Sequence, residues 1–267
     1  MDKQIRKKAK TFFLPVRGYV KQISLRNSQI QNVYYGCIQK TGSQWVKQIF
    51  SDFRIQKYTK LMTYPQHRYE WGEFKKQFPL YTFVPCLYIS YNLYEEIKKP
   101  KSYKTFYIIR DPRNIVVSWY YSMLETHPLM GKVGKNRMIL EKLSFEEGIS
   151  YCIEALQLKF SFMRDWMQNQ SDPNVLILKF EDLTKEPEPY FKNFFSHCEI
   201  DIPDEIIYSV ISDYSKEKMR EKDLNKRQQK SESHYRKKSS TWQDVFTEEH
   251  KRLFTDINGN LIDILDY

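Results

Sequence analysis

VYYGCIQKTGSQW, residues 33–45, is the stretch where an apolar strand turns into a helix. Its first six residues lack the polar alternation of a half-exposed strand, which is typical of a strand buried on both faces of a parallel sheet. Ser43 is the predicted N-cap of a helix over residues 44–54. A lysine, a glycine and two hydroxyls stand at the turn, where the N–H groups of a helix N-terminus attract anions. The stretch therefore predicts a phosphate or sulfate site.

This loop differs from the Walker A loop of NTPases, which reads GxxxxGK followed by Ser or Thr. Gly36 lies only four residues before Lys40, and Gln39 stands where Walker A has the glycine before its lysine. The second glycine, Gly42, follows the lysine instead of preceding it. The loop is therefore expected to be P-loop-like without being a Walker A loop.

Two further apolar runs, Thr105–Ile109 and Val175–Phe180, repeat the pattern of a strand followed by a helix. Asp111 and Pro112 are good starting residues for the helix after the second run. An apolar stripe predicts another helix before the third run, with the residues Ile149, Ile153, Leu156, Phe160 and Met163. After the third run, a helix is predicted over Lys185–Cys198.

The repeated pattern predicts an α/β fold, with residues 1–267 forming a single doubly wound domain around a central parallel sheet. In such sheets the ligand sites lie beyond the carboxyl ends of the strands. The chemistry is therefore expected at residues 39–45, 110–118 and 180–184.

The net charge of +10 is concentrated in two segments. Residues 1–10 carry five bases and one acid, residues 216–238 carry ten bases and four acids, and the remainder is neutral. A nucleic-acid binder would more often spread positive charge over a face of the domain. We therefore expect a confined polyanionic ligand and no nucleic acid.

Three segments stand apart from the strand and helix pattern. Residues 1–30 are expected to be a basic N-terminal extension, and residues 216–242 a basic loop that covers a cofactor. Residues 55–103 have aromatic side chains without a clean period, which predicts an irregular insertion lining an acceptor pocket. Within it we expect one strand near Thr82–Val84 and one helix near Tyr91–Lys98.

Cysteine usage and hydropathy bear on the compartment. The four cysteines stand far apart, so neither a zinc site nor a disulfide framework is indicated, and free thiols fit a reducing compartment. No segment approaches the roughly 20 apolar residues that span a bilayer. The sequence thus predicts a cytoplasmic protein without a membrane span.

A second anion site is predicted after the second strand. Arg110 stands at the tip of that strand, and Ser118 lies two turns into the following helix. Both side chains are then able to meet one phosphate beside the first loop.

These segments resemble the cofactor loops of the cytosolic-type sulfotransferases, which use 3′-phosphoadenosine 5′-phosphosulfate (PAPS). Residues 39–45 resemble the family's 5′-phosphosulfate loop, and residues 110–122 its 3′-phosphate loop. Residues 178–183 (LKFEDL) are similar to the family's YEDL segment, and residues 235–242 (YRKKSSTW) to its C-terminal RKGxxGDW segment. The resemblance covers roughly residues 32–45 and 104–254.

The resemblance implies in-line transfer of a sulfuryl group from PAPS to a hydroxyl of a small-molecule acceptor, which leaves 3′-phosphoadenosine 5′-phosphate (PAP) and needs no metal. Lys40 would stabilise charge on the departing phosphate, and Trp45 would stack on adenine. The other implied cofactor contacts are Thr41, Gly42, Ser43 and Gln44 at the 5′-phosphate, Arg110, Ser118, Arg236 and Lys237 at the 3′-phosphate, and Phe180 and Lys238 beside them.

Family members also carry a histidine, in a Thr-His pair after a strand between the first two motifs, as the general base. The corresponding stretch, Phe83–Leu87, has none. His127 is the preferred candidate, followed by His67, with Glu70 and Glu73 behind them.

Two alternative functions remain open. The missing Thr-His pair is compatible with a nucleotide-binding protein of the same fold that has lost or weak catalysis. A kinase-like phosphoryl transferase would need a Mg²⁺-binding acid after a strand, for which Asp111 and Asp182 are the available residues.

Overall fold

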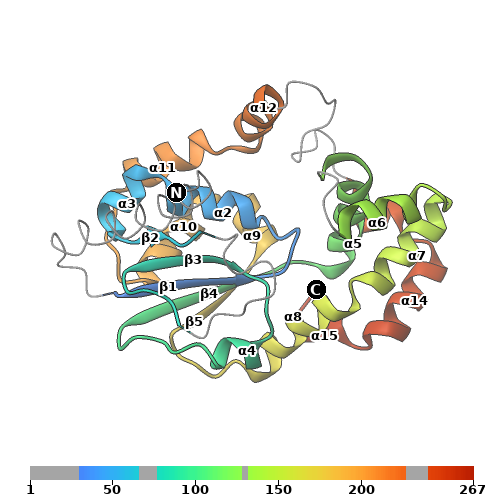
Figure 1. The fold of residues 1–267 in the computed structure, drawn as a ribbon, viewed down its shortest axis with the longest axis horizontal. Coiled ribbons are helices and arrows are strands. Elements are labelled where there is room, and N and C mark those ends of the chain that lie inside the picture. Colours follow the sequence, from blue (N-terminus) through green and yellow to red (C-terminus); the bar gives the residue numbers. More distant parts are fainter. Residues whose placement is uncertain (1–29, 66–76, 128–131, 227–239) are drawn as a thin grey trace, which may run out of the picture.

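The computed structural model describes residues 30–65, 77–127, 132–226 and 240–267 (Figure 1). These residues form one five-stranded parallel sheet in the order β2-β3-β1-β4-β5. The strands are β1 (Asn32–Cys37), β2 (Met62–Thr63), β3 (Thr82–Leu87), β4 (Tyr103–Ile109) and β5 (Val175–Lys179). The predicted α/β class with a central parallel sheet is confirmed.

Strand β1 lies in the middle of the sheet and is buried along its whole length. Tyr34 belongs to the apolar cluster on one face, whereas Val33 and Tyr35 belong to the cluster on the other. Successive side chains of a strand point to opposite faces, so both faces of this strand must be covered. The sequence of β1 therefore has apolar residues in succession instead of alternating apolar and polar residues.

Helices cover both faces of the sheet, as predicted (Figure 1). One face is covered by α2 (Ser43–Ser51), α3 (Phe53–Thr59), α9 (Phe180–Lys185), α10 (Pro187–His197) and α11 (Asp204–Asp213). The other is covered by α4 (Tyr91–Glu95), α5 (Pro112–Tyr121), α7 (Phe145–Ala155), α8 (Gln157–Asn169), α13 (Trp242–Val245), α14 (Glu248–Asn258) and α15 (Leu261–Ile264). The other helices among the described residues are the π-helical turn η2 (Ser122–Thr126), α6 (Lys132–Leu140) and α12 (Lys216–Lys226).

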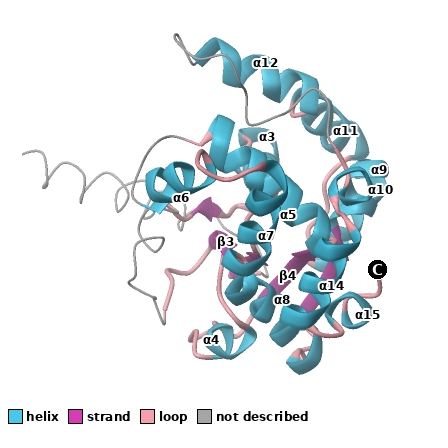
Figure 2. Ribbon diagram, turned by 90° about the vertical axis from the view of Figure 1, so that its right-hand side faces the viewer, coloured by secondary structure: helices cyan, strands magenta, loops and turns pink. Residues whose placement is uncertain are grey.

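Figure 2 views the molecule from the side where α5, α7, α8 and α14 pack together. The apolar stripe predicted before the third strand is entirely buried there. The stripe belongs to two helices, because α7 ends and α8 begins at Leu156, which caps both. Every described helix is too short or too polar to span a bilayer.

Helix boundaries differ from the predicted ones at two functional loops. Ser43 is the first residue of α2, and Gly42 is its N-cap, so the prediction of Ser43 as N-cap was wrong. The predicted helix over 44–54 ends at Ser51, because Asp52 caps α3 by accepting the Arg54 N–H. The predicted helix over 185–198 starts at Pro187, since proline fits only the first turn of a helix.

The described part of residues 55–103 has the expected strand and helix, β3 and α4, and adds the edge strand β2 to the sheet, which corrects the expectation of an irregular insertion. β3 pairs with the central strand β1, and β2 pairs with β3 at the edge. The aromatic residues show no single period because they reach both faces: Tyr64 and Phe78 lie in one apolar cluster and Phe83 in the other. That this stretch lines an acceptor pocket stays a prediction.

The basic segment also differs from its prediction as a loop. Residues 216–226 form helix α12, and the buried side chain of Met219 gives this helix an apolar anchor. Residues 227–239 lie outside the described part of the chain.

Candidate functional site

Three strand ends meet at one edge of the sheet. β1 lies between β3 and β4, with Gly36 paired to Leu87 and Cys37 paired to Ile108. β1 continues into α2 on one face and β4 into α5 on the other, so the connections diverge here. Ligands of open α/β sheets bind at such a switch point. The candidate site therefore comprises the three strand-end loops, residues 38–43, 88–90 and 110–111.

The loop after β1 is bent by two left-handed residues. Lys40 and Gly42 both have φ of 73°, whereas Thr41 between them does not have a positive φ. Thr41 Oγ1 donates to the carbonyl oxygen of Ile38 at 2.8 Å. Alternating backbone handedness turns successive N–H groups toward one side and forms a concavity for anions. Lys40 adopts this conformation without being glycine, a strain that is typical of functional sites.

Helix α2 begins directly at this loop. Its N-cap is Gly42, which has no side chain to cap the first turn, and Gln44 is exposed. The Trp45 N–H donates to the Gly42 carbonyl at 2.9 Å. The first N–H groups of a helix have no partner within the helix, and the helix dipole places partial positive charge there. The loop thus presents the features of an anion site that its sequence predicted.

Phe180, at the start of α9, packs against two of the loops. A Cβ atom at Gly42 would lie 2.6 Å from a ring atom of Phe180, so only glycine fits at this position. The guanidinium carbon of Arg110 lies 4.7 Å from the centre of the same ring. The Phe180 ring therefore sets the spacing between Gly42 and Arg110.

Arg110 joins the loop after β4 to the loop after β1. Its Nη1 atom donates to the carbonyl oxygen of Lys40 at 2.6 Å. Its Nε atom is buried without a hydrogen-bond partner and lies 4.0 Å from Glu181 Oε1. Burial lowers the pKa of Arg110, and the nearby acids Glu181 and Asp111 oppose this shift. A half-buried guanidinium whose buried Nε–H has no partner is suited to an anionic ligand.

Glu181 links this arginine to the end of the described chain. One carboxylate oxygen accepts the Asp111 N–H at 3.2 Å, and the other accepts the Tyr267 hydroxyl at 2.6 Å. Burial raises the pKa of Tyr267, as does its hydrogen bond to Glu181, so the phenol stays protonated. Neither Glu181 nor Tyr267 was predicted as a site residue from the sequence, where the acid of the 178–183 segment was the available signal.

Arg113 and Trp242 join the start of α5 to the start of α13. The Arg113 guanidinium carbon lies 3.9 Å from the centre of the Trp242 ring, and Nη2 bonds Asp111 at 2.9 Å. The backbone N–H of Trp242 donates to Asn114 Oδ1 at 3.0 Å. The segment that follows residues 235–239 is thereby fixed beside the loop that carries Arg110.

Tyr88 is a further site residue that was not predicted from the sequence. It follows β3, and its hydroxyl lies 3.0 Å from Ser43 Oγ in the first turn of α2. The third strand end thus reaches the same anion loop. Only the pairing of β3 with β1 reveals this contact, because the two residues are 45 positions apart.

The other predicted residues have different settings. Trp45 packs edge-on against Phe191, with ring centres 5.5 Å apart. Ser118 is half-buried in the second turn of α5. His127 follows η2, and its carbonyl oxygen accepts a hydrogen bond from Arg137 at 2.8 Å. The candidates His67, Glu70, Glu73, Arg236, Lys237 and Lys238 lie outside the described residues.

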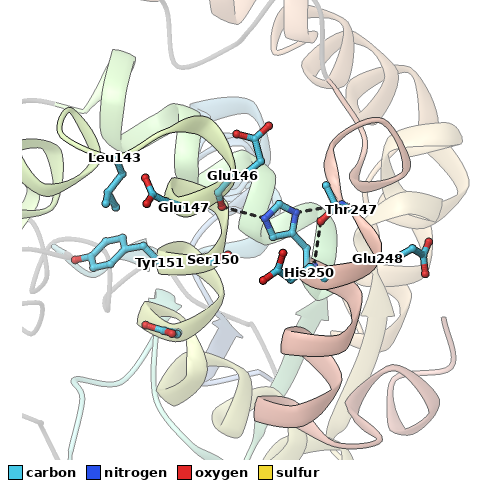
Figure 3. A pocket seen from close by; sticks show the side chains of 10 residues that line it. Leu143, Glu146, Glu147, Ser150, Tyr151, Thr247, Glu248 and His250 are labelled. Carbon is cyan, nitrogen blue, oxygen red and sulfur yellow. Dashed lines mark hydrogen bonds between the residues drawn. The ribbon is translucent and has the colours of Figure 1, made fainter.

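A separate pocket of about 580 Å³ lies between α7 and α14 (Figure 3). Five glutamates line it, which does not suit a phosphate: Glu146, Glu147, Glu154, Glu248 and Glu249. His250 in its wall accepts the Thr247 N–H and bonds the Glu146 carbonyl oxygen. Within residues 30–65, 77–127, 132–226 and 240–267, no group of three metal-ligating side chains is found. The strand-end loops remain the candidate site.

Comparison with known proteins identifies the family of the chain. The family described as "Sulfotransferase domain" matches residues 37–265. Sulfotransferase 1 family member D1 of Mus musculus is 26% identical over 114 residues, which are 40% of this chain and 34% of that protein. The matching part thus spans about a third of the length of this curated relative.

Two solved structures share the fold. The crystal structure of mouse sulfotransferase SULT7A1 complexed with PAP has a TM-score of 0.63 at 16% identity, covering 90% of this chain and 89% of that one. Retinol dehydratase in complex with androsterone and the inactive cofactor PAP has a TM-score of 0.54 at 16% identity, covering 86% and 80%. The family match includes the loop after β1, the loop after β4 and the segment around Trp242. The chain therefore belongs to the sulfotransferase-domain family.

Proposed function

We propose that this protein is a sulfotransferase that moves the sulfuryl group of PAPS to a hydroxyl of a small-molecule acceptor. The observation that carries the proposal is the hydrogen bond from Arg110 to the Lys40 carbonyl. It joins the loops after β1 and β4 at the carboxyl ends of the strands. A ligand with two separate phosphate groups requires two such anion-binding loops side by side. The solved relatives contain PAP, which has two such phosphates.

The residues present fit such a nucleotide. Three buried polar atoms without a hydrogen-bond partner occur at or beside the loop after β1: Gln39 Oε1, Trp45 Nε1 and Arg110 Nε. A buried polar atom without a partner costs about 1–3 kcal/mol. A polar ligand that bonds these atoms would recover that free energy, which supports a nucleotide at this edge.

PAPS supplies an activated sulfuryl group when it is bound. The Lys40 charge and the N–H groups of residues 41–44 would stabilise negative charge on the leaving phosphate. Arg110 and Ser118 would hold the 3′-phosphate, together with Arg236, Lys237 and Lys238. Such a site gains its rate from positioning the reactants and neutralising charge.

Removal of the acceptor proton is assigned to His127, with His67 as the second candidate. β3 carries no histidine, and the residue that follows it is Tyr88. Burial raises the pKa of Tyr88 well above its usual range, so its phenol is not a base near neutral pH. The lack of a histidine here is also the observation that favours a second candidate function, a nucleotide-binding protein with lost or weak catalysis.

The acceptor class and the compartment are proposed from the composition of the chain and the burial of its cysteines. Aromatic side chains in 55–103 favour an acceptor with an aromatic or lipid-like body. All four cysteines are free and buried, which supports a cytoplasmic, reducing setting. The neutral charge of the chain outside its two basic segments argues against a nucleic-acid partner.

Calorimetric titration with PAP tests the proposal, with ATP and adenosine 5′-phosphate as controls, each with and without Mg²⁺. We expect metal-independent binding of PAP in the micromolar range and weaker binding of adenosine 5′-phosphate. A preference for Mg·ATP would favour the kinase-like alternative, and absence of PAP binding would overturn the proposal. Transfer of labelled sulfate from PAPS to a panel of phenols and alcohols then separates an enzyme from a binding protein.

A further inference from the structure

The end of β3 is irregular where it approaches the anion loop. Cys86 has φ of 57°, a left-handed conformation for a non-glycine residue. The register between β1 and β3 shifts between Tyr34 and Gly36. Bulges and strained residues of this kind re-aim side chains beside functional sites. The irregularity stands two residues before Tyr88.

The redirected strand end holds Ser43 in two ways. The Tyr88 hydroxyl lies 3.0 Å from Ser43 Oγ, and the Cys86 thiol donates to the Ser43 carbonyl oxygen at 3.6 Å. Ser43 itself is buried in the first turn of α2. β3 therefore supports the loop from the side opposite to Arg110, which approaches it from β4.

Either oxygen of the Tyr88–Ser43 hydrogen bond is able to donate, and an anion beside α2 would select one direction. Burial raises the pKa of the Tyr88 phenol, and the neighbouring Cys86 and Cys37 thiols raise it further, so the phenol keeps its hydrogen. Ser43 has one hydrogen to donate and two lone pairs to accept with. An anion beside α2 needs donors, so the favourable chain runs from Tyr88 to Ser43 and from Ser43 to the anion.

We infer that Tyr88 is a positioning residue for the 5′-phosphate of the nucleotide: with the nucleotide bound, its hydroxyl donates to Ser43 Oγ and leaves the Ser43 hydrogen for that phosphate. The inference rests on the proposed function, since it concerns the same nucleotide. It adds Tyr88, which follows β3, to a site that was predicted from the sequence to consist of the loops after β1 and β4. Tyr88 acts through Ser43 and takes no proton from the acceptor.

The test is calorimetric binding of two ligands to the full chain and to its Tyr88→Phe variant. PAP has a 5′-phosphate, whereas adenosine 3′-phosphate lacks one. Loss of one hydrogen bond predicts about a three- to tenfold weaker affinity for PAP. Affinity for adenosine 3′-phosphate is expected to stay within about twofold, because the lost donor chain serves only the 5′-phosphate. Equal losses for both ligands, or unchanged PAP affinity, would overturn the inference.

Tyr103→Phe is the matched control. The Tyr103 hydroxyl bonds Asp172 at 2.6 Å, and Tyr103 begins β4 at the opposite end of the sheet. This variant also loses one phenolic hydrogen bond, yet its affinity for both ligands is expected to equal that of the wild type. A PAP-selective loss in Tyr103→Phe as well would contradict a local role for Tyr88.

Ser43→Ala keeps the inference testable if Tyr88→Phe does not fold. Ser43→Ala is expected to weaken PAP binding and to spare adenosine 3′-phosphate. In the double variant, Tyr88→Phe should cause no further loss beyond that of Ser43→Ala, because Tyr88 acts through Ser43. If the fold-losses in PAP affinity of the two single variants multiply in the double variant, the inference is overturned.

The wild-type titration separates the two failures. If the wild-type chain does not bind PAP, the proposed function fails. If it binds PAP and the variants keep the wild-type selectivity between the two ligands, only the assignment of Tyr88 fails.

Discussion

The Nη1 atom of Arg110 lies 2.6 Å from the carbonyl oxygen of Lys40, although the two residues are 70 positions apart. The contact fixes the arginine of the β4 loop to the backbone of the β1 loop at the strained residue Lys40. Phe180 fills the space between Arg110 and Gly42. The loops after β1 and β4 are therefore held against each other, and changes in either should affect a ligand that contacts both.

Arg110→Ala should weaken PAP binding selectively. A hydrogen bond to a charged group is worth about 1.5–3 kcal/mol, which corresponds to roughly 10- to 100-fold in affinity. Adenosine 5′-phosphate lacks the 3′-phosphate and should lose no more than about threefold. Calorimetry with both nucleotides measures the difference. Arg252→Ala, on the exposed side of α14, serves as the control. Equal losses for both nucleotides would argue against a second anion site at Arg110.

Lys40→Ala should abolish most turnover and have a smaller effect on binding. Removing one group that stabilises developing charge costs about 10²- to 10³-fold in kcat. Alanine is also an L-residue, so the left-handed backbone at this position is strained in both forms. Steady-state sulfate transfer gives kcat, and calorimetry gives the affinity for PAP. Lys57→Ala, at an exposed position of α3, should retain wild-type kcat. Full activity of Lys40→Ala would refute the assigned role.

Gly42→Ala should destabilise the fold and the site together. The new Cβ would meet the Phe180 ring at 2.6 Å, and φ of 73° is strained for alanine. Left-handed strain and overpacking together cost about 2–4 kcal/mol. The midpoint of thermal unfolding should fall by roughly 5–15 °C.

Gly134→Ala is the matched control for Gly42→Ala. A Cβ at Gly134 meets nothing within 4 Å, and this glycine lies inside α6. Alanine there should raise stability by about 0.5–1 kcal/mol, since glycine is unfavourable inside a helix. Similar midpoints for the two variants would show that Gly42 is not constrained as described.

Glu181→Gln should strengthen PAP binding at low salt. The substitution removes a negative charge 4.0 Å from Arg110 Nε and keeps an oxygen able to accept the Asp111 N–H. We expect affinity to rise about two- to fivefold, with a smaller gain at high salt because salt screens charges. Calorimetry at two salt concentrations measures this. Glu181→Ala should instead lose about 1–3 kcal/mol of stability, because Asp111 and Tyr267 lose their acceptor.

Alkaline pH should destabilise the protein through its buried tyrosines. Burial raises the pKa of Tyr34 to about 12, although the hydrogen bond from Asn32 opposes part of the shift. An unfolded tyrosine titrates near 10, so above about pH 10 the unfolded state binds fewer protons than the folded state. Stability therefore falls as the pH rises. Denaturant unfolding between about pH 9 and 11.5 should show a shallower fall for Tyr34→Phe. Equal slopes for the two proteins would contradict the shift.

The strand–loop–helix units could be predicted because their signals are local. The apolar run before Gln39 is buried on both faces, and Asp111 caps the helix that Pro112 begins. The predicted end of the helix over 44–54 was wrong because the Asp52 side chain accepts the Arg54 N–H, a contact that competes with continued helix. Local patterns thus predict elements well and their ends less well.

The sequence by itself determined the parallel sheet and the anion loop around Lys40, because burial of a strand and the start of a helix depend on neighbouring residues. Only the tertiary structure decided which side chains support that loop. Tyr88 reaches Ser43 because β3 lies beside β1, and Arg110 reaches Lys40 because β4 lies on its other side. These contacts depend on strand order and register, which come from packing of the whole core and leave no signature in residues that are tens of positions apart.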